Sequence, residues 1–228
     1  MAADTCIRRI WMGGCLAAIL GALNGCATIH EVMVDAINNP TKPMGTSYRL
    51  EVHDPSGGVD KELGAKAIAN AKDALSARGL YEAPANAKPD MIIDLEYGVG
   101  PGQIKIVYRS PADVSMSNIG PQEPPAKPIL VFEKFLQLTG REPTPEVPAP
   151  APGPARGRKR GDELWSVHVS VEDQKKDLAP YIPVLASVSV EYIGRNTGQE
   201  KHFEVDADKA ESALRHPNQA PPAPPPRQ

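Results

Sequence analysis

The chain has 228 residues, with 25 Lys and Arg against 28 Asp and Glu, and it carries a formal net charge of −3. A chain of this length has room for one domain with a substantial core and is short for two. The mild acidity excludes a general electrostatic binder of polyanions. We therefore expect no nucleic-acid partner, and any basic contact site must be local.

Residues 1–25 have the three zones of a signal peptide. A start charged by Arg8 and Arg9 is followed by an uncharged stretch over residues 10–23. This stretch is shorter than the roughly 18 to 20 apolar residues that a helix needs to cross a bilayer. The two arginines lack the neighbours of a twin-arginine motif. The sequence predicts an ordinary signal peptide rather than a transmembrane helix.

The end of this segment, Leu23-Asn24-Gly25-Cys26, resembles the bacterial lipobox. The resemblance implies a thioether lipid on Cys26, cleavage before it and acylation of the new amino terminus, which together give stable membrane anchoring. Cleavage would leave 23 basic against 27 acidic residues, a net charge of −4. The alternative is a plain secretory signal cut after Ala22 or Ala27.

Three cysteines are present, and two of them, Cys6 and Cys15, lie in the predicted signal peptide. The mature chain would keep Cys26 alone. This excludes an intramolecular disulfide and any zinc or iron–sulfur site built on several cysteines. We expect no cofactor and no metal site.

The mature chain is predicted to begin with a lipidated tether over residues 26–44, which carry turn formers and little periodicity. A single domain is expected over 45–215. Alternating apolar residues at 48–52 predict a strand. Residues 60–78 predict one long helix, because six apolar side chains fall on one face: Leu63, Ala67, Ile68, Ala71, Ala74 and Leu75.

Later elements are predicted mainly as strands. Alternation indicates strands at 91–99 and 104–108, with Gly100-Pro101-Gly102 as a hairpin turn between them. Ten of the 25 prolines lie between residues 121 and 154, where only 129–138 has the pattern of an ordered element, and a Pro/Ala-rich insertion is expected near 141–162. Further predicted elements are strands at 167–171, 184–192 and 203–205, a short helix at 206–215 and a disordered Pro-rich tail at 216–228.

These elements predict an α+β fold. We expect an antiparallel or mixed sheet of about five to six strands, with one long helix packed on one face and disordered Pro-rich segments outside it.

No residue pattern indicates catalysis. The histidines of the mature chain have no ligand or catalytic spacing: His30, His53, His168, His202 and His216. His168 and His202 are interpreted as solvated histidines of a sheet. Asp94 and Glu96 share one outward strand face, where carboxylates two residues apart are common without a chemical role. The chain lacks a nucleophile elbow, a phosphate loop and a His-Glu-x-x-His pair.

The sharpest charged feature is a basic cluster formed by Arg156, Arg158, Lys159 and Arg160. One interpretation is contact with lipid phosphates, peptidoglycan acids or an acidic partner. The other, which we favour, is a solvated patch that keeps a linker soluble.

Several segments together resemble the bacterial lipoproteins grouped as domain of unknown function 4136. They are the lipobox, the strand at Tyr48, the helix end Ala74-Leu75-Ser76-Ala77-Arg78-Gly79-Leu80 and Lys88-Pro89-Asp90-Met91-Ile92-Ile93. The resemblance covers residues 45–110, with the turn at 192–198 added, and the proline-rich insertion departs from it. It implies an envelope location and an α+β domain, and it implies no activity.

We therefore expect a non-enzymatic, membrane-anchored bacterial lipoprotein whose periplasmic domain serves protein interaction or envelope assembly. Ala27 stands where many inner-membrane lipoproteins have Asp, which favours the outer membrane over the inner one. The alternatives are a periplasmic binder of a small ligand of unknown identity and an enzyme of unrecognised type. A large apolar cleft would indicate the small-ligand binder, and an exposed strand edge would indicate the interaction protein. Convergence of His53, Asp94 or Glu96 on a cleft would indicate the enzyme.

Overall fold

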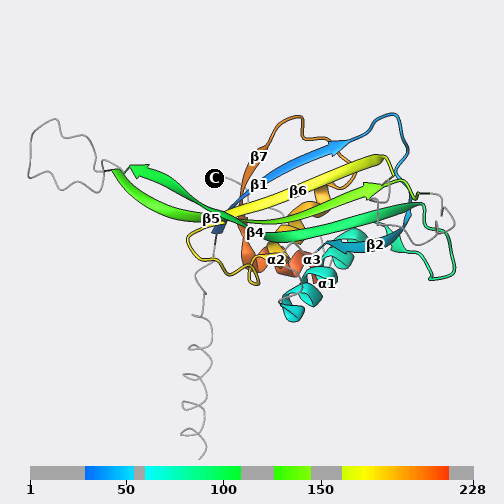
Figure 1. The fold of residues 1–228 in the computed structure, drawn as a ribbon, viewed down its shortest axis with the longest axis horizontal. Coiled ribbons are helices and arrows are strands. Elements are labelled where there is room, and N and C mark those ends of the chain that lie inside the picture. The colour runs from blue at the N-terminus through cyan, green and yellow to red at the C-terminus, as the bar shows by residue number, and fades with distance from the viewer. Residues whose placement is uncertain (1–28, 54–59, 109–125, 145–160, 216–228) are drawn as a thin grey trace, which may run out of the picture.

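The computed structural model describes residues 29–53, 60–108, 126–144 and 161–215 (Figure 1). They form a seven-stranded mixed sheet with three helices on one of its faces, which confirms the predicted α+β class. The prediction of five to six strands and one helix on the sheet is corrected to seven strands and three helices. The difference arises because some segments have a hydrophobic period that does not match the helix or strand they form.

The strand order is β3-β2-β4-β5-β6-β1-β7. The parallel pairings are those of β2 with β3 and with β4, and the other neighbours are antiparallel. The strands are β1 (Ile29–Asn38), β2 (Ser47–His53), β3 (Tyr81–Glu82), β4 (Met91–Tyr108), β5 (Ala126–Arg141), β6 (Glu163–Asp173) and β7 (Lys201–Asp206).

The core lies between the sheet and α1 (Lys61–Ala77), α2 (Ile182–Tyr192) and α3 (Ala207–Arg215). The long helix α1 begins at Asp60, whose side chain accepts hydrogen bonds from the backbone N–H groups of Glu62 and Leu63. It is followed by Gly79 at a φ of 90°, a conformation that favours glycine. The buried residues of this helix are three alanines and one leucine, and these small side chains let the helix lie close to its neighbours. They are Ala67, Ala71, Ala74 and Leu75.

The prediction of a strand at 184–192 is wrong, because this segment is the helix α2. Valines and alanine alternate with serines there, which is the strand period. Burial overrides that preference: every residue from Ile182 to Ala186 is buried among the core side chains. Two residues indicate the start and the end of the helix in the sequence. Pro183 lies in its first turn, and Gly194 follows its end at a φ of 69°.

The predicted tether over 26–44 is also corrected, because β1 lies within it, between β6 and β7. Val32, Val34 and Ala36 are buried and alternate with more exposed residues. The alternation is present in the sequence but is only a few residues long. The ordered domain therefore includes Ile29–Asn38, and its start precedes Gly45.

The predicted hairpin turn at residues 100–102 is a bulge inside the continuous strand β4. The register with β5 shifts between Val99 and Gly102, so Gly100 and Pro101 lie opposite Glu133 alone. Proline has no N–H to give to a ladder and is tolerated at a bulge. After the bulge, the side chains at even positions of β4 lie on the face that the odd positions occupied before it.

Several expectations concern residues outside the described ranges. They are the signal peptide, the lipobox Leu23, Asn24, Gly25 with Cys26, the basic cluster Arg156, Arg158, Lys159 and Arg160, and the tail 216–228. Within the described ranges, none of the helices has the length and apolar content needed to cross a membrane.

Candidate functional site

The face of the sheet opposite the helices, called here the open face, carries most of the polar side chains of β2, β4 and β5. Alternation along these strands places Arg49, Glu51, His53, Asp94, Glu96, Gln137, Thr139 and Arg141 on it. Parallel pairing sets Glu51 opposite Asp94 and His53 opposite Glu96. Residues more than 40 positions apart thus become neighbours.

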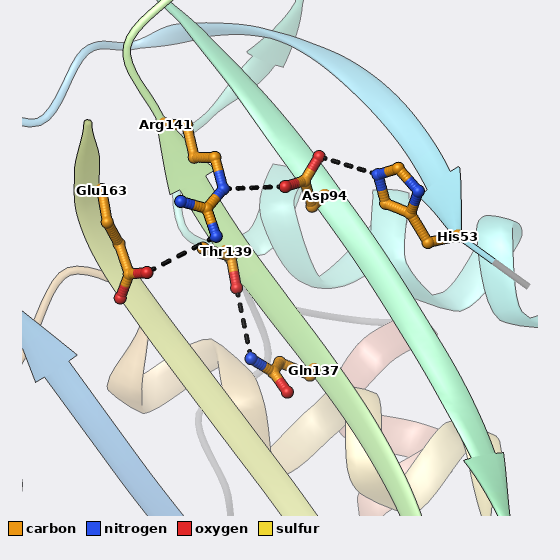
Figure 2. A network of polar contacts seen from close by, with 6 residues as sticks. All are labelled: His53, Asp94, Gln137, Thr139, Arg141 and Glu163. Carbon is orange, nitrogen blue, oxygen red and sulfur yellow. Dashed lines mark hydrogen bonds and ion pairs between the residues drawn. The ribbon is translucent and has the colours of Figure 1, made fainter. Parts of the chain in front are cut away.

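Asp94 is the centre of a charged network on this face (Figure 2). Its Oδ1 lies 3.0 Å from Nε2 of His53, and its Oδ2 accepts a hydrogen bond of 2.9 Å from Nε of Arg141. Nη2 of Arg141 lies 3.6 Å from Oε2 of Glu163 on β6. The network therefore crosses four strands and fixes the orientation of the Asp94 carboxylate.

Asp94 is only 4% exposed, although its strand face is the open one. We interpreted Asp94 and Glu96 as equivalent carboxylates of a solvated face, and the structure corrects this for Asp94. The reason is lateral packing: the longer side chains of His53 and Arg141 lie on the neighbouring strands and cover the shorter Asp94.

One group of side chains on the open face has the composition of a metal site. Single ligand atoms of Glu51, His53 and Asp94 all lie within 4.8 Å of one another. The sequence singled out His53 and Asp94 but not Glu51 and did not predict a metal site, because metal motifs are recognised by local spacing and here the partner strand supplies the third residue.

Two further histidines of the sheet, His168 and His202, contact acidic side chains. His168 lies 3.4 Å from Glu133 and stacks on the ring of Phe135. His202 lies 3.3 Å from Glu31 and 3.2 Å from Glu200 and is more than half exposed. Among the described residues, neither histidine joins the Asp94 network.

A buried lysine lies on the helix side of the sheet, beside the bulge. Lys134 is fully buried, its Nζ lies 3.8 Å from Oδ2 of Asp173 and 4.7 Å from the ring centre of Tyr181, and it has no hydrogen-bond partner among the described residues. Burial lowers the pKa of Lys134, and Asp173 and Asp177 oppose the shift. Tyr181 donates a hydrogen bond of 2.5 Å to Asp173.

The far end of the β4–β5 hairpin, residues 102–108 and 126–131, projects beyond the rest of the sheet and is called here the arm (Figure 1). Its face on the helix side is apolar, because Ile104 pairs with Leu130 and Ile106 with Pro128. Ile104, Ile106 and Leu130 are 75%, 59% and 51% exposed. Exposed apolar patches of this kind mark interaction surfaces.

Both long edges of the arm lack a partner strand within the described residues. The pairing of β2 with β4 ends at Glu96, and that of β6 with β5 ends at Phe132. Free backbone N–H and C=O groups at such edges can pair with another strand. The arm contacts the body of the domain through an ion pair between Lys105 and Glu172.

A shallow cavity of about 320 Å³ lies at the opposite end of the sheet. It is lined by the end of β1 and the start of β6, with Ile37, Pro40, Leu164 and Trp165 as its apolar residues and Asn39 and Glu163 as its polar ones. This volume is at the lower limit of small-molecule pockets.

Comparisons with known proteins show no family for this chain. No family model and no curated protein matches the sequence. A PDZ domain protein from Parabacteroides distasonis is 13% identical with a TM-score of 0.40, and the match covers 79% of this chain but only 40% of that one. Two PelC dodecamer structures from Paraburkholderia phytofirmans are 12% and 13% identical with TM-scores of 0.34 and 0.33, and each match covers 72% of this chain and 92% of theirs. The resemblance to domain of unknown function 4136 stays a prediction.

Proposed function

We propose that this chain is a bacterial envelope lipoprotein without enzymatic activity, anchored through lipid on Cys26, and that its domain binds a partner protein through the arm. The observation that carries the proposal is the arm itself, with three large apolar side chains exposed on one face and two edges that no described strand pairs with. Exposing such a surface to water does not stabilise an isolated domain, whereas a partner strand would cover it.

The mode of binding follows from the chemistry of the arm. An extended segment of a partner pairs with the free edge of β4 or β5 through backbone hydrogen bonds, which give affinity. Apolar side chains of the partner pack on Ile104, Ile106 and Leu130, which give specificity. Pro128 in the arm has no backbone N–H to donate, which limits uncontrolled pairing.

The anchor and its location form the second part of the proposal. Only two residues separate Cys26 from the first described residue, Ile29, so a lipid on Cys26 would hold the sheet close to the membrane surface. The absence of Asp after Cys26 supports the outer membrane, with the domain in the periplasm, and kinship with domain of unknown function 4136 would agree with this location.

Site-specific photo-crosslinking in cells tests the arm. A crosslinking residue placed at Ile104 should give a discrete adduct with one envelope protein, and Leu130→Asp in the same chain should abolish that adduct. The matched control places the crosslinker at Lys209, an exposed position on α3. Equal adducts from both positions, or an adduct that survives Leu130→Asp, would contradict the assignment of the arm.

Intact-mass measurement of the membrane-bound protein tests the anchor separately. The expected mass is that of residues 26–228 with added acyl chains, and Cys26→Ser should release the protein from the membrane fraction. A chain that begins elsewhere, or an unmodified Cys26, would remove the anchor from the proposal and leave the arm untouched.

Small-ligand binding is the second candidate function, and the shallow cavity beside Trp165 is the observation that favours it. Its apolar lining and the single carboxylate of Glu163 suit a small apolar molecule with a donor group. Trp165 is the only tryptophan after residue 25, so a ligand bound in the cavity should change the tryptophan fluorescence of the mature chain. Ile37→Asp at the cavity should abolish this change and leave partner crosslinking at Ile104 unchanged.

A further inference from the structure

Three side chains with metal-binding atoms converge on the open face without any contribution from a loop. Glu51 and His53 are two residues apart on β2 and share its open face. Asp94 lies opposite Glu51 in the parallel register of β4. The backbone at Glu51 and His53 pairs with β4 on one side, and the backbone at Asp94 pairs with β2 on one side and with β5 on the other.

The distances are close to those around one ion. In a tetrahedral zinc site with bonds of about 2.0 to 2.2 Å, ligand atoms lie roughly 3.3 Å apart. Nε2 of His53 lies 3.0 Å from Oδ1 of Asp94, which is shorter by only a few tenths of an ångström. Glu51 is exposed, and its ligand atom already lies within 4.8 Å of the other two, so a rotamer change brings it into place.

We propose that Glu51, His53 and Asp94 bind one divalent transition-metal ion, with Zn²⁺ as the preferred metal. One imidazole nitrogen and two carboxylate oxygens suit Zn²⁺, whereas Mg²⁺ and Ca²⁺ prefer oxygen ligands alone. The remaining coordination positions face solvent on the side of Glu51 and are filled by water. The site lies on β2 and on the part of β4 that pairs with it, outside the arm.

Arg141 supplies the outer contact that a metal-binding carboxylate needs. Its Nε donates to Oδ2 of Asp94, so Oδ1 is directed toward His53. Such outer partners fix ligand geometry in metal sites. Glu163 lies 3.6 Å from Nη2 of the same guanidinium and offsets part of its repulsion of a cation.

The test is a Zn²⁺ titration of the full chain, purified in detergent with a tag that contains no histidine and stripped of metal with EDTA. Native mass spectrometry gives the stoichiometry, competition with a chelating dye gives the affinity, and Co²⁺ absorption reports the coordination. We expect one Zn²⁺ per chain. His53→Ala and Glu51→Gln should each weaken binding about 10-fold or more, because each removes one of three ligands.

Glu51 is exposed, so Glu51→Gln should unfold at the wild-type temperature. His53→Ala also removes a contact of the buried Asp94, so its loss of Zn²⁺ is judged together with that of Glu51→Gln. The matched control is His202→Ala, which removes another histidine that contacts two carboxylates, and it should change the affinity less than twofold. The proposal is overturned if the wild-type chain binds no Zn²⁺, if His53→Ala binds it as tightly as wild type, or if His202→Ala is the variant that loses the ion.

Discussion

The β4–β5 hairpin places one pair of strands in two environments. Its base, residues 91–99 of β4 and 132–141 of β5, lies inside the sheet, and Leu95, Leu136 and Leu138 are fully buried beneath the helices. Its arm continues the same apolar alternation, yet Ile104 and Leu130 are more than half exposed. Alternation thus determines which side of a strand is apolar, and the neighbouring elements determine whether that side is covered.

The same leucine-to-alanine substitution in the two parts gives the largest expected contrast. Leu138→Ala should lower the free energy of unfolding by about 2 to 5 kcal/mol, because it leaves a cavity in the core. Leu130→Ala should change it by about 0.5 kcal/mol or less, because this side chain already contacts water. Urea denaturation measures both. A cost of several kcal/mol at Leu130 would mean that the arm is covered in the purified protein.

Two glycines, one in the base and one in the arm, allow the packing of the two parts to be compared by adding one methyl group to each. A Cβ on Gly140 in the base would lie 2.4 Å from Nε1 and 2.5 Å from Cε2 of the buried Trp165, so Gly140→Ala should cost about 1 to 3 kcal/mol. A Cβ on Gly102 in the arm would lie 2.9 Å from Cε1 of Phe132 and 3.0 Å from Cδ1 of Leu130.

Leu130 is exposed and can move aside, so Gly102→Ala should cost less than Gly140→Ala, about 1 kcal/mol or below. Thermal unfolding followed by circular dichroism gives the order of the two variants. The reverse order would show that the arm is packed more rigidly than the base.

Lys134 lies at the boundary between base and arm and gives the smallest expected effect. Burial lowers its pKa from 10.5 in the folded chain, whereas the unfolded chain keeps the ordinary value. Below the folded-state pKa both states are protonated, and the cost of burying the charge is fully present. Between that pKa and 10.5 the unfolded state binds more protons, so the free energy of unfolding rises with pH in this window.

Lys134→Met removes the titrating group. At pH 7 the variant should match or exceed wild type by about 1 kcal/mol, and this advantage should shrink as the pH rises toward 10.5. Urea denaturation of both proteins between pH 7 and 10 measures the difference. Parallel curves would show that the lysine is not desolvated in the folded protein.

Much of the fold is predictable from local patterns. The periodicity of Lys61–Ala77 and the Asp60 cap predict α1, and alternation predicts β2, both parts of β4 and β6. Two elements are not predicted correctly for the same physical reason. In α2 a strand-like pattern is buried on a helix, and in β1 a short alternation is stabilised only by β6 and β7 on its two sides.

The candidate site divides in the same way. The sequence by itself determined that Glu51, His53 and Asp94 lie on polar strand faces, because this depends only on the two-residue period of a strand. It also predicts that Cys26 is the one thiol left for an anchor, if the chain is cleaved before it. Only the tertiary structure placed Glu51 and His53 beside Asp94, covered Asp94 with Arg141 and left the arm without a partner strand among the described residues. Strand order and register are set by contacts between distant segments, and no local pattern in the chain specifies them.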